Sequence, residues 1–119
     1  MDDTASDSES QGPRPGRPAR GTSTGRPLLV AFDLLGRRWA LRVVWELRAE
    51  TLGFRELQRR CGDMSSSVLR DRLTELTGAE LVEAGEAGYA LSEHGRDLLG
   101  ALEPLNRWAD GWARRSRRA

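Results

Sequence analysis

The sequence predicts a mainly α-helical domain that carries one small β-hairpin. Apolar side chains recur at helical spacing in four successive segments and again near the carboxyl terminus. Before that last segment, two short runs alternate around "GEAG", which is typical of a hairpin. Two short helices joined by "CGDM" and followed by a hairpin have the layout of a winged helix-turn-helix. A small helical bundle with an incidental hairpin would give the same periodicity.

The first three helices are expected after Pro27. "PLLVAFDLLG" predicts a short helix, because Pro27 suits a first helical turn and Gly36 suits a helix end. The apolar spacing in "RRWALRVVWELRAE" predicts a second helix. After a break at Gly53, "FRELQRR" predicts a third helix with apolar side chains inward and arginines outward, and Gly62 suits its end.

The later helices carry their own start and stop signals. Ser65 or Ser66 can accept a hydrogen bond from the free N–H groups at the start of the fourth helix, and Gly78 ends it. Ser92 is the expected cap of the last helical segment, which Pro104 either kinks or divides into two helices. The fourth helix has an apolar stripe made of Val68, Leu69, Leu73 and Leu76.

Composition excludes several classes of function. The chain has 119 residues, enough for one small domain, with one cysteine, one histidine and a net charge of +1. We therefore expect no disulfide, no metal site, no cofactor and no catalytic residues, and hence no enzyme. All 19 basic side chains are arginines, so a basic surface would come from their local clustering. The acidic "MDDTASDSES" start lacks a signal-peptide core and no apolar run could span a membrane, so we expect a cytoplasmic protein.

Three regions are predicted along the chain. Residues 1–26 are rich in Gly, Pro, Arg and Ser and should form a disordered tail, which either aids solubility or touches nucleic-acid phosphates. Residues 27–113 should form the winged helix-turn-helix domain with terminal dimerisation helices, and residues 114–119 a basic tail. The terminal helices carry more apolar surface than one small core can use, which predicts a homodimer. The expected dimer interface comprises Leu28, Phe32, Leu102, Leu105, Trp108 and Trp112.

Four segments also carry a resemblance to a known family. "FDLLGRRWALRVVWEL", "FRELQRR", "MSSSVLRDRLTELTGAELVE" and "YALSEHGRDLL" resemble, in order and spacing, the HxlR-type winged helix-turn-helix transcriptional regulators. The resemblance covers roughly residues 26–112. It implies a bacterial homodimer that binds double-stranded DNA sequence-specifically as a repressor or activator, with a dimer formed through the first and last helices.

The resemblance implies that residues 65–77 form the recognition helix. Because the apolar stripe should face the core, we expect the opposite side chains to contact bases, and Arg70 is suited to bidentate bonding with guanine. The alternative interpretation is an ordinary solvated face. The expected base contacts are Ser66, Ser67, Arg70 and Thr74. The expected phosphate contacts are Arg55, Arg59, Arg60 and Arg72.

The expected wing departs from the family pattern. Family members carry a longer hairpin, often with Pro and Arg, whereas only "AGEAG" fills that position here. Its Glu86 should repel phosphate, so either wing contacts are lost or the arginine-rich termini replace them. The alternative function is therefore a winged-helix protein-interaction module with weak or lost DNA binding.

Two further departures concern a thiol and a tryptophan. Many family members keep a Cys-Pro before the first helix and use that thiol to sense oxidants; the dipeptide here is Arg26-Pro27, so that chemistry does not carry over. Cys61 is either a small buried hydrophobe or a thiol activated by neighbouring arginines. Arg42 and Trp45 are expected either to repack simply or to form a cation–π pair that serves as a patch for a small-molecule effector or a partner protein.

Overall fold

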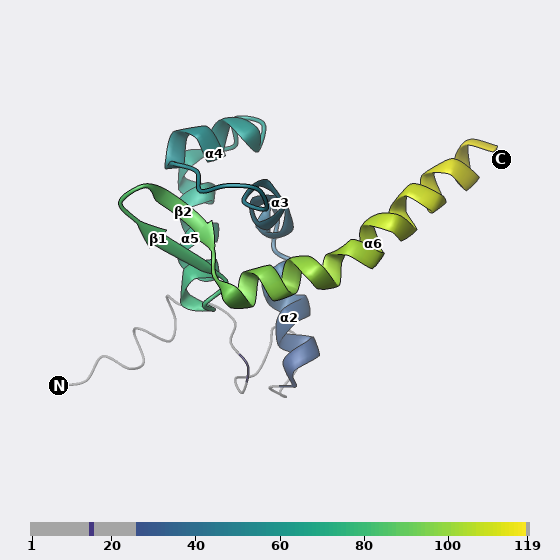
Figure 1. Cartoon of the computed structure of the whole chain (residues 1–119), viewed down its shortest axis with the longest axis horizontal. Coiled ribbons are helices and arrows are strands. Elements are labelled where there is room, and N and C mark those ends of the chain that lie inside the picture. The colour runs from purple at the N-terminus through teal and green to yellow at the C-terminus, as the bar shows by residue number, and fades with distance from the viewer. Residues whose placement is uncertain (1–14, 16–25, 119) are drawn as a thin grey trace.

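A computed structural model describes residue 15 and residues 26–118 of the chain. Most of the expected tail, residues 1–14 and 16–25, lies outside the described residues. The observed order of helices, hairpin and last helix confirms the predicted fold class (Figure 1). The elements are α2 (Pro27–Leu35), α3 (Ala40–Glu46), α4 (Phe54–Arg60), α5 (Ser66–Gly78), β1 (Val82–Gly85), β2 (Gly88–Leu91) and α6 (Glu93–Arg118).

The short helix α3 lies at the centre of the domain. It packs against α2, α4, α5 and α6, and its Val43 and Val44 are completely buried. Removal of these apolar side chains from water is the main force that holds the helices together. The other large side chains of this core are Leu34, Leu47, Leu52, Leu57, Met64, Leu69, Leu73, Leu76, Val82 and Leu91.

The hairpin is antiparallel, and a third segment of backbone extends it. Val82 pairs with Leu91 at one end and Gly85 with Gly88 at the other, which confirms the predicted hairpin. Leu52, which precedes α4, exchanges two backbone hydrogen bonds with Tyr89 at 3.0 and 2.7 Å. A side chain at Gly88, where φ is +129°, would lie 2.3 Å from the Leu52 carbonyl oxygen. This close approach requires glycine.

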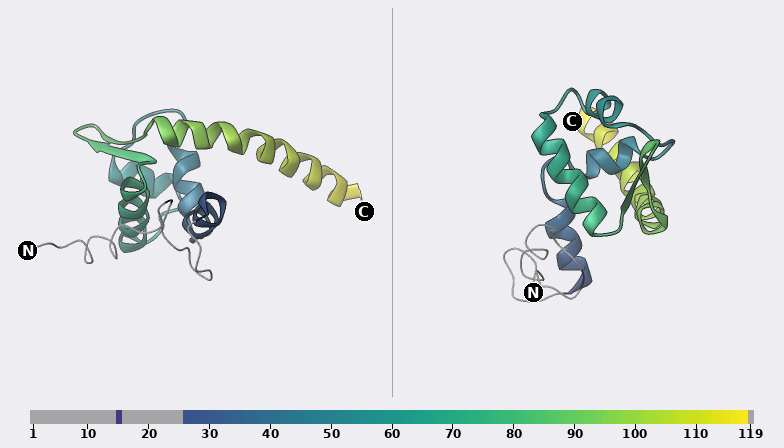
Figure 2. Two further views of the ribbon diagram at one scale, coloured as in Figure 1. Left: turned by 90° about the horizontal axis from the view of Figure 1, so that it is seen from below. Right: turned by 90° about the vertical axis from the view of Figure 1, so that its left-hand side faces the viewer.

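Helix α6 is continuous, and Pro104 lies inside it. Of the two alternatives for Pro104, division into two helices is therefore wrong. The helix also continues through residues 114–118, which we expected to form a tail beyond the domain. Its outer half extends away from the rest of the domain (Figure 2). None of the helices in the described part of the chain is long and apolar enough to cross a membrane.

Candidate nucleic-acid interface

The turn between α4 and α5 is held by side-chain and backbone hydrogen bonds. Gln58 Nε2 donates to the Met64 carbonyl at 2.9 Å, and the Asp63 N–H donates to the Gln58 carbonyl. Ser65 Oγ then accepts from the Val68 N–H at 3.2 Å, so Ser65 caps α5 as one of the two predicted candidates. These bonds fix the direction in which α5 leaves the turn.

The two faces of α5 differ sharply in exposure. Leu69, Leu73 and Leu76 are buried in the core, as the apolar stripe predicts. The opposite face carries the four side chains predicted to contact bases, and all four are exposed: Ser66, Ser67, Arg70 and Thr74. The guanidinium of Arg70 lies 5.2 Å from the centre of the Phe54 ring, a cation–π contact that orients it near the start of α4.

Helix α4 contributes three of the predicted phosphate-binding arginines. Arg55 is exposed and has no ion pair with any other described residue. Arg59 and Arg60 both bond the Glu56 carboxylate, and Arg60 also reaches Glu50 at 3.0 Å. Hydrogen bonds from Arg59 and then Arg60 lower the pKa of Glu56 to about 2. A phosphate would therefore compete with Glu56 for these two guanidinium groups.

Arg72 occupies a different environment from the one predicted. We expected it on the flank of α5, but its side chain is only 16% exposed. Its Nη1 lies 3.3 Å from Glu75 Oε1, and the other oxygen of that carboxylate accepts from Arg37 at 2.8 Å. Contact with a phosphate would require this partly buried pair to separate.

The wing is short and acidic in the structure as well. Glu83 and Glu86 are exposed on the hairpin, together with the small residues Ala84, Gly85 and Ala87. No arginine or lysine lies between residues 73 and 95 of the sequence. The hairpin therefore presents negative charge beside α5, which opposes the approach of phosphates.

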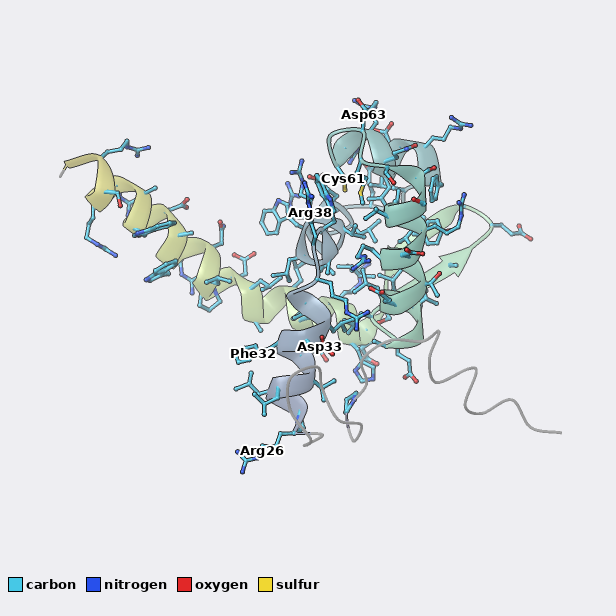
Figure 3. The ribbon with its side chains drawn as sticks, turned by 180° about the vertical axis from the view of Figure 1, so that it is seen from behind. Arg26, Phe32, Asp33, Arg38, Cys61 and Asp63 are labelled. Atoms are coloured by element: carbon cyan, nitrogen blue, oxygen red, sulfur yellow. The ribbon has the colours of Figure 1, made fainter. Side chains whose placement is uncertain are left out.

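The single thiol lies in the core beneath the helix-turn-helix. Cys61 is fully buried at the end of α4 (Figure 3). Burial raises the pKa of the Cys61 thiol, and the positive charge of Arg42 offsets only part of that effect. Of the two interpretations, these observations favour a buried hydrophobe over an activated thiol.

Of the two alternatives for Arg42 and Trp45, the cation–π pair is wrong, because Arg48 and not Arg42 stacks on Trp45. Arg42 donates to Glu46 at 2.8 Å and to the Arg60 carbonyl at 2.7 Å, where it satisfies the end of α4. The ring of Trp45 is stacked by Arg48 instead, at 4.2 Å. Trp45 also lines a groove of about 260 Å³ between α3 and α6, together with Leu41, Leu102, Leu105, Asn106 and Ala109.

The terminal helices expose most of the apolar residues predicted for a dimer. Leu28 and Phe32 on α2 are 63% and 62% exposed, and Phe32 projects outward from α2 (Figure 3). On α6, Leu105, Trp108 and Trp112 are 51–56% exposed, and the two indole rings stack at 5.4 Å. Leu102 instead packs partly against the core. Within the described residues, no cluster of His, Cys, Asp and Glu could hold a metal ion.

Three comparisons relate the chain to known proteins. The transcriptional regulator YodB of Bacillus subtilis is 31% identical over 87 residues, which cover 67% of this chain and 78% of YodB. The uncharacterized regulator YvaP of the same organism is 28% identical over 89 residues, covering 69% and 82%. The crystal structure of quinone-bound YodB superposes with a TM-score of 0.64 and 33% identity, covering 68% of this chain and 92% of that one.

A family model and a further solved structure agree with these relatives. A possible HxlR family factor from Thermoplasma volcanium has a TM-score of 0.64 and 26% identity over 74% of this chain and 85% of its own. The model described as HxlR-like helix-turn-helix matches residues 34–117, which is more than half of the chain. The chain therefore belongs to the HxlR-like helix-turn-helix family of transcriptional regulators.

Proposed function

We propose that this protein acts in the cytoplasm as a homodimer that regulates transcription by binding double-stranded DNA sequence-specifically. One observation carries the proposal: the exposed face of the capped helix α5 presents Ser66, Ser67, Arg70 and Thr74 together, while its other face is anchored in the core. A rigid helix with such a polar face fits the major groove, where each base pair offers a distinct pattern of donors and acceptors.

Arg70 is the residue that we assign to base selection. Its contact with Phe54 limits the directions in which the guanidinium points before DNA arrives. A bidentate contact with guanine O6 and N7 is worth ~1–3 kcal/mol of discrimination, whereas serine and threonine hydroxyls both donate and accept and so select weakly.

The phosphate contacts differ in how available their side chains are. Arg55 needs no rearrangement, since none of the described acidic groups pairs with it. Arg59 and Arg60 reach phosphate by exchanging Glu56, and Arg72 does so only by leaving Glu75. The order of expected contribution is therefore Arg55 first, Arg59 and Arg60 next, and Arg72 last.

The apolar faces of α2 and α6 support a two-fold dimer. Burying five exposed side chains that include three aromatic rings against a second copy removes a surface that monomeric proteins rarely leave open. Two copies related by two-fold symmetry would present two α5 helices about one DNA turn apart, or a multiple of it. The operator is then a near-palindrome.

A small-molecule effector or a partner protein is the second ligand that we propose. The groove beside Trp45 is lined almost entirely by apolar side chains and lies between α3, at the centre of the core, and α6, which carries the proposed dimer face. The related YodB has been solved with a quinone bound. Arg42 bonds the end of α4 and is not among the residues that line this groove.

The test is selection of bound duplexes from a random pool, followed by titration of the selected duplex. A homodimer making about six phosphate contacts would lose about 10³ in affinity between 50 and 200 mM salt. Arg70→Ala should relax base preference at one position of each half-site, whereas Arg55→Ala should weaken all sequences about equally and reduce the salt slope. An unchanged preference in Arg70→Ala would show that the assignment of Arg70 is wrong.

The acidic wing favours one alternative function, a winged-helix module that binds another protein and has weak or lost DNA binding. The exposed Glu83 and Glu86 and the net charge of only +1 both weaken attraction to phosphates. A pool selection at low salt that enriches no sequence and shows no salt-dependent binding, together with a partner protein recovered by pulldown, would support this alternative over the proposed function.

A further inference from the structure

A partly buried cluster of charged side chains joins α5 to α2 and to the turn between α2 and α3. Arg37, in that turn, donates through Nη1 to Glu75 Oε2 at 2.8 Å and lies 3.8 Å from Asp33. Arg72, one turn earlier on α5, lies 3.3 Å from the other oxygen of Glu75. The side chains of these four residues are only 9–17% exposed.

Stability alone does not account for this arrangement. Charged groups taken out of water lose solvation that their mutual attraction recovers only when every polar atom is satisfied. Here Arg37 Nε, Arg72 Nε and Glu75 Oε1 are buried without a hydrogen-bond partner. Replacing a buried ion pair by apolar side chains of similar size is often neutral or stabilising in proteins. What charged groups provide and apolar groups do not is a directional contact.

The turn that carries Arg37 is itself held in an uncommon conformation. Trp39, two residues later, has a φ of 78°, in a region that bulky side chains rarely adopt. Such backbone persists only where the surrounding structure over-determines it. The Arg37 guanidinium therefore projects from a fixed backbone and meets a fixed carboxylate 38 positions further along the sequence.

We propose that Arg37 is a positioning residue for base recognition, which sets the rotation of α5 by holding Glu75. Glu75 directly follows Thr74 and lies just over one turn beyond Arg70. Successive residues of a helix are about 100° apart around its axis, so a small rotation of α5 moves the base-contacting side chains sideways across the groove. This inference rests on the proposed function, because it concerns DNA that α5 reads.

The experiment compares two duplexes of equal length, the selected operator and a scrambled sequence, by fluorescence anisotropy at one salt concentration. Full-length wild type, Arg37→Met and Arg38→Met are titrated against both. Arg38 is the matched control, because it is the adjacent arginine, is exposed, and stacks 5.5 Å from the Trp39 ring outside the cluster. Both variants lose one positive charge, so general attraction to DNA changes equally in the two.

In Arg37→Met, we expect the ratio of operator to scrambled affinity to fall about tenfold, equivalent to about 1.4 kcal/mol. Arg38→Met should keep the wild-type ratio. Arg37→Lys keeps the charge but lacks the planar fork, so it should lose part of the ratio, and it serves as the test if Arg37→Met does not fold. A purely structural role would lower the melting temperature and leave the ratio unchanged.

An Arg37→Met or Arg37→Lys ratio equal to that of Arg38→Met would overturn the proposal. So would an equal loss of affinity for both duplexes, since that outcome reports charge or stability and not position. A wild-type chain that binds the two duplexes equally would instead refute the proposed function, and the positioning role with it.

Discussion

Ser92, between β2 and α6, links the start of α6 to the turn after α5 through one hydroxyl group. The effect of removing that hydroxyl group on stability can be calculated. The side chain is 9% exposed at the start of α6. Its Oγ accepts from the Gly95 N–H at 3.0 Å and donates to the Glu80 carbonyl at 2.6 Å. Ser92→Ala removes a helix cap, at about 1 kcal/mol, and a second hydrogen bond, at about 1 kcal/mol more. The expected total of about 2 kcal/mol corresponds to a melting temperature lower by about 8–16 °C in a domain of this size.

Ser65→Ala is the matched control for this prediction. Ser65 also caps a helix, accepting from Val68 at 3.2 Å, but it is exposed, and its other hydrogen bond, at 3.0 Å, is to the exposed Ser67 hydroxyl and not to the backbone. Water can replace that exposed bond at little cost, so Ser65→Ala should cost mainly the cap, about 1 kcal/mol. Thermal unfolding is followed by circular dichroism at one fixed protein concentration, because the proposed dimerisation would link stability to concentration. If the two variants lose equal stability, the bond from Ser92 to Glu80 contributes nothing and the reasoning fails.

Three further predictions follow from single residues. Cys61, whose thiol pKa burial raises, should react with a disulfide reagent at neutral pH far more slowly in the folded chain than in urea; equal rates would contradict its burial. The Glu56 pKa of about 2 against an ordinary 4.5 means that its pairing stabilises the fold above pH 4.5 and is lost as pH falls towards 2. Glu56→Gln should weaken the dependence of the melting temperature on pH in that window and raise DNA affinity by releasing Arg59. An unchanged pH dependence and an unchanged affinity would refute these two expectations. Gly88→Ala should destabilise the chain by more than about 1 kcal/mol, while Gly85→Ala, with open space around it, should not.

Local signals in the sequence predicted local structure well. The caps at Ser65 and Ser92, the helix start at Pro27 and the exposed polar face of α5 all follow from interactions between residues within one or two turns. Such interactions depend only on residue type and spacing. The part of the fold that presents the candidate interface can therefore be predicted from the sequence alone.

Contacts between distant segments cannot be predicted in this way. Nothing in the pattern indicates that Arg37 meets Glu75, or that Leu52 pairs with Tyr89 through a single residue. The error at Arg42 has a different origin. Glu46 lies one turn away, nearly as close in sequence as the aromatic ring we paired with it, and a carboxylate binds a guanidinium more strongly than a ring does.

The proline inside α6 has a consequence for how stability is distributed along the chain. Pro104 has no N–H, so the Gly100 carbonyl lacks its helical partner near the point where α6 leaves the body of the domain. Beyond that point the helix has little tertiary packing to support it, and isolated helices of this length are marginal in water. The outer half of α6 is therefore the segment whose amide protons should exchange first with solvent, and slower exchange there at higher protein concentration would report the proposed contact with a second chain.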